Sequence, residues 1–299
     1  MLKQEVVFEN GNNIIKIVCN QINDNKILNC TDSIIQNLKN DKIKEENVLN
    51  VSCKTVLNED KIKNDCVDIR DILHIDCVIF FAKDAQEIYD FNIIATKITK
   101  MIKKPVIVAF DGFFAKNQKM KVHIFDKTVN VQQFCNENVL KTDVEKDITE
   151  VFKQYKDISG REYKLVDSYL TKDADVLMFS LGSSFEIIKD GVDKLRKNGE
   201  KVGGFTVKVL RPLAKSDIFN VCKDAKFLIC LDEQEHTKNQ NYNISIDVKK
   251  CLSQQNTKVT TCIYGFNNTD FYSSDIVKIF NEGFCHLKGE NKGTFACHI

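Results

Sequence analysis

Short apolar runs alternate with amphipathic stretches along the second half of the chain, and this alternation constrains the fold more than any other feature. The pattern predicts strands over residues 175–181, 201–210, 225–231 and 258–264, and helices over 215–222, 244–252 and 273–281. A further helix is expected to follow Gly182 and end at Gly199, and a last strand at 294–298. Buried parallel strands read as continuous apolar runs joined by helices. The sequence therefore predicts an α/β domain with a mostly parallel sheet.

The first half of the chain shows the same alternation less regularly. Strands are expected over residues 13–19, 76–81, 105–110 and 121–125, and helices over 33–38, 85–103 and 144–155. Residues 131–162 are polar, and we place the domain boundary there. The sequence thus predicts an α/β fold of two three-layer modules, with a first domain over 1–130, a linker over 131–164 and a second domain over 165–299.

Charge and hydropathy exclude two classes of function. The chain has 43 Lys and Arg against 42 Asp and Glu, a formal net charge of +1. Nucleic-acid binding through bulk positive charge is therefore not expected. No apolar run approaches the roughly 20 residues that cross a bilayer. Because the N-terminus has acids early and no long apolar core, neither a secretory signal nor a transit peptide is expected, and the cytoplasm is the expected compartment.

The 12 cysteines show no spacing typical of a metal site. No C-x-x-C pair occurs, which argues against iron–sulfur and zinc-ribbon sites. Most cysteines stand in apolar runs and are interpreted as small buried side chains. The dipeptides Cys285-His286 and Cys297-His298 could hold a metal only by meeting in space, and no metal ligand is predicted.

Two turns that follow predicted strands are candidate ligand sites. Gly182, Ser183 and Ser184 stand between a strand and a helix, where an α/β sheet offers backbone N–H groups to an anion. Asp111 and Gly112 also follow a strand, and the carboxylate there could bind a ligand or act as a base. A capping box over 183–186 and a simple turn at 111–112 explain the same residues without a ligand. No catalytic residue is assigned.

The chain resembles pyruvate:ferredoxin oxidoreductase from residue 158 onward. The resemblance is carried by Ser159-Gly160-Arg161-Glu162-Tyr163 and by the ordered segments 173–183, 199–203, 207–213 and 226–232. Earlier in the chain, residues 68–70, 85–90, 104–106 and 110–113 are similar to the end of the family's first domain. The resemblance implies that 1–130 is a degenerate pyrimidine-binding-like domain and that 165–299 is a transketolase C-terminal-like domain.

The family's cofactor site is not matched. The family holds and activates thiamine diphosphate with a Thr-Pro-Ser-Ser-like turn and a Glu. Here the nearest counterpart to the turn is Thr31-Asp32-Ser33, which has no Pro, and the Glu has no matching counterpart, Glu59 being the one candidate for it. The family's cluster domain and its Gly-Asp-Gly motif have no counterpart. The resemblance therefore implies that this chain binds no cofactor by itself, and that thiamine diphosphate matters only if a partner subunit supplies its site.

Three functions stay open. The first is a non-catalytic relative that binds a partner or scaffolds a larger assembly. The second is an oxidoreductase subunit of a split 2-oxoacid:ferredoxin oxidoreductase, with the thiamine diphosphate and iron–sulfur domains on other chains. The third is a small-ligand sensor that uses the Gly182 turn.

The first two functions require a protein partner, and a homodimer is compatible with both. Phe114 stands where the family has an Arg, and Phe266 follows a C-terminal strand. Both are predicted interface anchors, because aromatic residues are enriched where proteins meet. Burial of both rings in the core is the alternative.

Overall fold

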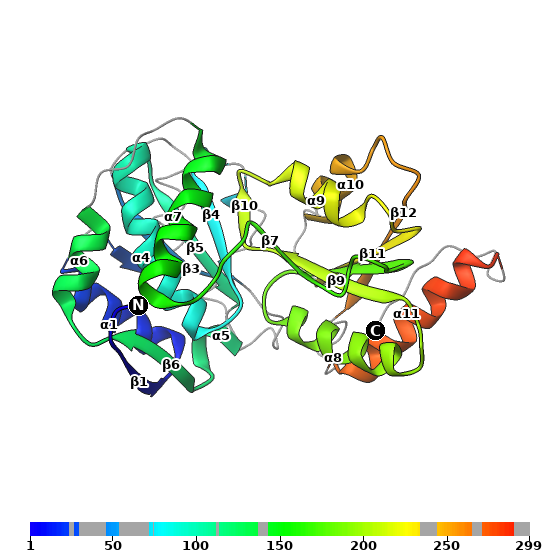
Figure 1. The fold of residues 1–299 in the computed structure, drawn as a ribbon, viewed down its shortest axis with the longest axis horizontal. Helices are drawn as coiled ribbons and strands as arrows, with labels where there is room; N and C mark the ends of the chain where they lie inside the picture. The colour runs from blue at the N-terminus through cyan, green and yellow to red at the C-terminus, as the bar shows by residue number, and fades with distance from the viewer. Residues whose placement is uncertain are drawn as a thin grey trace, which may run out of the picture. The chain divides into compact units, whose positions relative to one another are not determined.

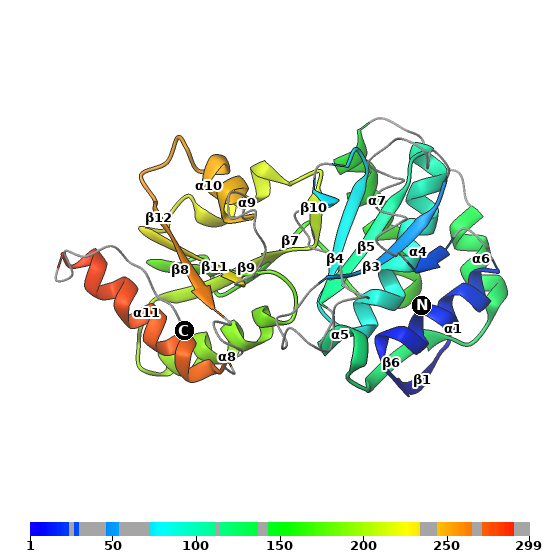
Figure 2. The same cartoon turned by 180° about the vertical axis from the view of Figure 1, so that it is seen from behind.

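The computed structural model divides into two compact units, neither of which is one continuous stretch of chain. Unit 1 comprises residues 1–54, 62–165 and 208–213, and unit 2 comprises residues 55–61, 166–207 and 214–299. Figures 1 and 2 show the elements of each unit from opposite sides. The structure describes residues 1–23, 27–29, 46–53, 72–73, 75–111, 114–136, 143–233, 244–264 and 271–289.

Unit 1 contains a five-stranded sheet in the order β10-β4-β5-β3-β2. Strands β2 to β5 run parallel, and β10 is antiparallel to β4. A separate antiparallel pair joins β1 to β6. The elements are β1 (Gln4–Glu9), α1 (Gly11–Ile22), β2 (Ile27–Asn29), β3 (Val48–Cys53), β4 (Val78–Ala82), α4 (Ala85–Ile102), β5 (Val106–Asp111), α5 (Phe114–Asn117), β6 (Met120–Phe125), α6 (Thr128–Asn136), α7 (Val144–Ser159) and β10 (Val209–Arg211).

Helix α4 forms the middle layer of unit 1. It packs on the sheet and is covered by α1, α6 and α7, so that nearly all of its residues are buried. Asp84 caps its first turn by accepting a hydrogen bond from the backbone N–H of Glu87, and Lys103 ends it in the left-handed conformation. A helix that is buried on every side must satisfy each of its polar side chains inside the protein.

Unit 2 is a three-layer module around a mostly parallel sheet in the order β12-β11-β8-β9-β7, in which β7 is antiparallel to β9. Helices α8 and α11 lie on one face of the sheet, and α9 and α10 lie on the other (Figure 1). The predicted α/β class is confirmed. The elements are β7 (Val166–Tyr169), β8 (Val176–Phe179), α8 (Ser184–Lys197), β9 (Val202–Val207), α9 (Lys215–Cys222), β11 (Phe227–Glu233), α10 (Ile244–Cys251), β12 (Lys258–Tyr264) and α11 (Ser273–Leu287).

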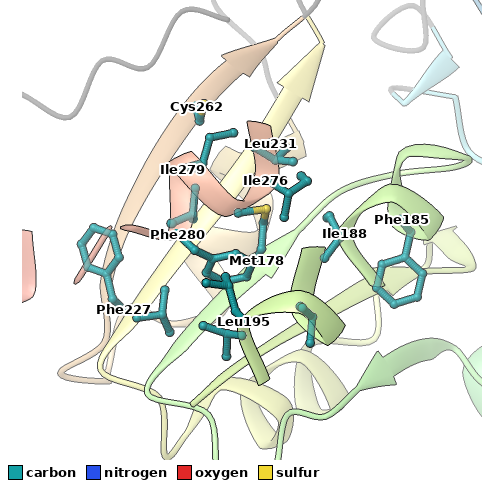
Figure 3. Packing of buried hydrophobic residues seen from close by; sticks show 14 residues of the cluster. Met178, Phe185, Ile188, Leu195, Phe227, Leu231, Cys262, Ile276, Ile279 and Phe280 are labelled. Carbon is teal, nitrogen blue, oxygen red and sulfur yellow. The ribbon is translucent and has the colours of Figure 1, made fainter. Parts of the chain in front are cut away.

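The hydrophobic core of unit 2 lies between its sheet and the helices α8 and α11. Figure 3 shows Met178 of β8 among Ile188 of α8 and Ile276 and Phe280 of α11, all of them fully buried. The two helices approach closely at Gly191, where an added Cβ would lie 2.3 Å from Cγ2 of Ile276. Residue 191 therefore has no room for a side chain.

Gly191→Ala is expected to destabilise the protein by about 1–3 kcal/mol, the usual cost of overpacking a core. Alanine raises helix propensity by about 1 kcal/mol over glycine, so a loss would show that the contact with Ile276 decides the outcome. Urea unfolding followed by circular dichroism measures the change. Asp190→Ala at the exposed neighbouring position serves as the control and should alter stability little. A stabilised Gly191→Ala variant would show that the helices separate without cost.

The strand expected over residues 13–19 is wrong, because this segment belongs to helix α1. Ile14, Ile15, Val18 and Ile22 are its buried apolar residues, at the spacing of one helix face. The side chain of Asn10 accepts a hydrogen bond from the backbone N–H of Asn13 and so caps the first turn. The expected helix at 33–38 and the expected strand at 294–298 lie outside the described residues.

The single strand expected over residues 201–210 is also wrong, because the chain changes sheets at Lys208. Strand β9 ends at Val207 in the sheet of unit 2, and β10 pairs with β4 in unit 1. The backbone N–H of Lys208 donates to the carbonyl of Leu165 (2.9 Å), and its carbonyl accepts from the N–H of Phe81 (2.9 Å). The segment 131–164, which the sequence analysis treats as a linker, contains α6 and α7, and both helices pack against α4.

Candidate functional site

The carboxyl ends of the parallel strands in unit 1 form one edge of the sheet, which we call the carboxyl edge. Strands β3, β4 and β5 end there at Cys53, Ala82 and Asp111, and Cys53 lies beside Asp111 in the strand register. Open α/β sheets bind ligands outside this edge. The fold therefore makes the carboxyl edge the first place to test for a functional site.

Asp111 lies at the carboxyl edge as the sequence predicts, and it serves the fold there. It is 7% exposed, and its Oδ1 accepts a hydrogen bond from the backbone N–H of Ala115 (3.0 Å) in helix α5. Its role toward a ligand stays a prediction. Gly112, the side chain of Phe114 and Phe266 lie outside the described residues.

A buried ion pair next to the carboxyl edge escaped the sequence analysis. Nζ of Lys208 donates to Oε1 of Glu87 at 2.6 Å, and the side chains are 4% and 5% exposed. The other carboxylate oxygen, Oε2, accepts from the backbone N–H of Lys83 (2.9 Å). Burial raises the pKa of Glu87 above its usual value, and the positive charge of Lys208 opposes that rise. The partners are 121 residues apart, so no local pattern could have indicated the pair.

The acids described at the carboxyl edge all accept hydrogen bonds from the chain itself. An acid that activates thiamine diphosphate must be free to reach it. Here Asp84 accepts from the backbone N–H of Glu87 (2.8 Å), Glu87 is held by Lys208, and Asp111 holds helix α5. Each of the three carboxylates thus accepts at least one hydrogen bond from the chain itself, while Oδ2 of Asp111 is buried and accepts no hydrogen bond within the described part of the chain. Thr31-Asp32-Ser33 and Glu59, the counterparts suggested by the resemblance, lie outside the described residues.

A second set of titratable groups in unit 1 surrounds Asp90, which is fully buried. Arg161 donates to both carboxylate oxygens of Asp90, with Nε 2.6 Å from Oδ2 and Nη2 2.8 Å from Oδ1. The hydroxyls of Tyr155 and Tyr163 also donate to it. Burial, followed by the charge of Asp90, raises the pKa of both tyrosines well above the usual value. Both hydroxyls therefore stay protonated as donors, and the arrangement holds the end of α7 against α4.

The turn at residues 182–184 in unit 2 differs from the capping box predicted over residues 183–186. Gly182 has a φ of +65°. Ser183 has helical backbone angles and makes no capping hydrogen bond with its side chain. Oγ of Ser184 donates to the carbonyl of Leu181 (2.8 Å). The capping box is therefore wrong, because a residue with helical angles does not place its hydroxyl over the free N–H groups of the first turn.

Two hydroxyls near this turn were not singled out from the sequence. Oγ of Ser180 and Oγ1 of Thr206 are buried and have no partner among the described residues. Their residues stand side by side at the ends of β8 and β9, where Phe179 is the register partner of Phe205. A ligand role for Gly182, Ser183 and Ser184 stays a prediction.

Gly182→Val is expected to lower the stability by about 1–3 kcal/mol, because a β-branched residue is strained at positive φ. Gly182→Asn is the matched control, since asparagine tolerates the left-handed conformation and should retain more of the stability. Melting temperatures of the two variants test this. An unchanged melting temperature together with lost binding of a partner would instead identify the turn as a binding site.

The described residues offer no group of three or more His, Cys, Asp and Glu side chains placed to hold a metal ion. Burial raises the pKa of the Cys77 and Cys222 thiols to about 12, so both are protonated and unreactive at neutral pH. The ring of His286 packs 5.8 Å from that of Phe227, and Cys297 lies outside the described residues. Within the described part of the chain, every helix is too short or too polar to span a bilayer.

Two family models match the chain. Residues 49–172 match the family described as pyruvate flavodoxin/ferredoxin oxidoreductase, thiamine diphosphate-binding. Residues 174–276 match pyruvate:ferredoxin oxidoreductase core domain II. The two matches meet at residues 172–174, close to residue 166, where the segment 166–207 of unit 2 begins.

Curated relatives are similar over a large part of this chain. Pyruvate synthase subunit PorA of Thermotoga maritima is 28% identical over 186 residues, which are 51% of this chain and 47% of PorA. PorA of Methanocaldococcus jannaschii is 27% identical over 237 residues, 67% of this chain and 60% of that protein. Ketoisovalerate oxidoreductase subunit VorA of Pyrococcus horikoshii is 24% identical over 51% of this chain and 47% of its own length. The chain thus spans about half the length of the curated relatives it matches.

A solved structure shares the fold. The 2-oxoglutarate:ferredoxin oxidoreductase of Magnetococcus marinus superposes with a TM-score of 0.57 at 12% identity, covering 93% of this chain and 65% of that one. Together with the two family matches, this likeness extends over both units. The chain therefore resembles pyruvate:ferredoxin oxidoreductase in two of that family's domains, the thiamine diphosphate-binding type over residues 49–172 and core domain II over residues 174–276.

Proposed function

We propose that this chain is a non-catalytic component of a multi-chain assembly of the 2-oxoacid:ferredoxin oxidoreductase type, to which it contributes its two α/β domains. One observation carries the proposal: Asp84, Glu87 and Asp111, the described acids at the carboxyl edge, are all engaged by the chain itself. A chain can keep a family's fold without its chemistry, because function depends on the site and not on the fold.

The need for partner chains rests on the relatives. PorA and VorA are named as subunits, and the chain spans about half their length. In this proposal, a chain whose described edge acids bond to its own backbone and side chains relies on other chains for a cofactor-dependent reaction. The partners in this proposal are therefore proteins that supply the cofactor-binding and electron-transfer parts.

The alternative is a catalytic subunit of a split 2-oxoacid:ferredoxin oxidoreductase. It is favoured by the family that residues 49–172 match, which is described as thiamine diphosphate-binding. In that case Glu59 would be the acid that serves the cofactor, and partner chains would supply the diphosphate-binding and iron–sulfur domains.

Purification of the tagged chain from its native extract tests the proposal. We expect it to copurify with other chains, and the isolated chain to show no micromolar affinity for thiamine diphosphate by calorimetry. In the purified assembly, Glu59→Gln should leave any oxidation of 2-oxoacids unchanged. Loss of that activity would establish the catalytic alternative, and a chain that purifies alone would refute both functions.

A further inference from the structure

A pocket of about 510 Å³ lies at the amino edge of the unit 1 sheet, the opposite edge from the candidate site. It is formed where β4 begins, where α4 ends and where α7 begins, and Val78, Ile102 and Val144 line it from these three elements. Pockets of about 300–1,000 Å³ with mostly apolar walls and a few polar groups are typical of small-molecule sites. Size and lining therefore make this pocket a candidate binding site that the proposed function does not use.

Four of the five charged residues that line the pocket have a role in the fold. Nζ of Lys104 pairs with Oδ2 of Asp76 at 2.5 Å. Asp143 caps helix α7 by accepting from the backbone N–H of Glu145 (3.0 Å). The guanidinium of Arg211 donates to two backbone carbonyls, those of Leu73 (3.2 Å) and Leu210 (2.7 Å). These four residues need no ligand to account for them.

Asp147 is the fifth charged residue, and it differs from the others. It stands in the first turns of α7, is 5% exposed and lines the pocket. Its carboxylate has no side-chain partner among the described residues, although its backbone N–H bonds to the carbonyl of Asp143. A carboxylate without a side-chain partner beside apolar walls is expected to attract a cation or a hydrogen-bond donor.

We propose that this pocket binds a small organic amine, with the ammonium group at the carboxylate of Asp147. The aliphatic body of the amine would lie against Val78, Ile102 and Val144. Two positive and three negative side chains line the pocket, and this excess of one negative charge favours a cation over an anion. The proposal goes beyond the proposed function and does not depend on it.

Isothermal titration calorimetry with 3-methylbutan-1-amine tests the proposal on the full chain. We expect saturable binding of the amine, and binding at least about tenfold weaker for 3-methylbutan-1-ol, which has the same shape and no charge. Asp147→Asn should weaken the binding of the amine by about tenfold or more, because hydrogen bonds to charged groups are the strong ones. Asp157→Asn, at an exposed position on the same helix, should leave it unchanged.

A second variant changes the shape of the pocket and leaves its charged residues unchanged. Val144 is 37% exposed, so the Val144→Phe variant should fold while its larger side chain narrows the pocket. It should weaken the binding of the amine at least fivefold. The proposal is overturned if the amine shows no saturable binding, if the alcohol binds as tightly, or if folded Asp147→Asn retains the wild-type affinity. The proposal is also overturned if Asp157→Asn weakens the binding of the amine as much as Asp147→Asn does. Loss of any negative charge on the protein would then explain the effect.

Discussion

Asp90→Asn is expected to lower the free energy of unfolding by about 3–5 kcal/mol, the usual cost of breaking a buried ion pair from one side. Asp90 is fully buried and accepts hydrogen bonds from Arg161, Tyr155 and Tyr163. Asparagine keeps the volume but loses the charge, and its amide group places a donor against these donors. Because total stabilities are about 5–15 kcal/mol, the variant should unfold at far lower urea concentrations.

Glu162→Gln is the matched control for Asp90→Asn. Glu162 pairs with Lys156 at 2.9 Å in the same unit, and their side chains are 55% and 49% exposed. Exposed ion pairs contribute little to stability, so the unfolding midpoint of this variant should barely move. Equal losses in the two variants would show that burial does not set the contribution of the Asp90 pair.

Lys208→Met is the second change with a large expected effect, also about 3–5 kcal/mol. It leaves the buried carboxyl of Glu87 without the cation that lies 2.6 Å from it. Glu87→Gln should cost a similar amount by leaving the ammonium buried and unpaired. The double variant Glu87→Gln with Lys208→Met should be more stable than either single variant, since no unpaired charge remains. Urea unfolding of the four proteins forms a double-mutant cycle, and additive losses would contradict a coupled pair.

The deficit of Lys208→Met should also depend on pH. Burial already raises the pKa of Glu87 in the folded state, and removing the Lys208 charge raises it further. The carboxyl of the unfolded chain titrates near its reference value of about 4.3. At a pH between the unfolded-state and the folded-state pKa of Glu87, the folded state binds more protons than the unfolded state. The stability of the variant is therefore lost as the pH rises through this range. The deficit relative to wild type should therefore be larger at pH 8 than at pH 5.

Elements with a continuous local pattern could be predicted from the sequence. Strand β12 spans residues 258–264 as expected, and α4 lies within two residues of its expected bounds. Helix α1 was missed because its apolar residues Ile14, Ile15 and Val18 also fit a short apolar strand. Strand β10 could not be found at all, since a strand of three residues that joins a distant sheet leaves no periodicity.

The location of the candidate site at the end of a strand could be predicted from the sequence, but the contacts of its side chains could not. The position of Asp111 at the end of a strand follows from the apolar run before it. Its contact with α5 and the pairing of Glu87 with Lys208 depend on residues brought together by the fold. The buried hydroxyls of Ser180 and Thr206 were hidden for the same reason, because their burial is set by packing and not by spacing.

The return of residues 208–213 to unit 1 means that no single cut of the gene separates the two units. A fragment that ends at residue 165 would lack β10, so the outer edge of β4 would lose its partner strand and Glu87 its cation. A fragment that begins at residue 166 would carry Lys208 without the carboxylate that neutralises it. Neither fragment is therefore expected to fold as an independent protein, and expression of one unit requires a chain that carries both.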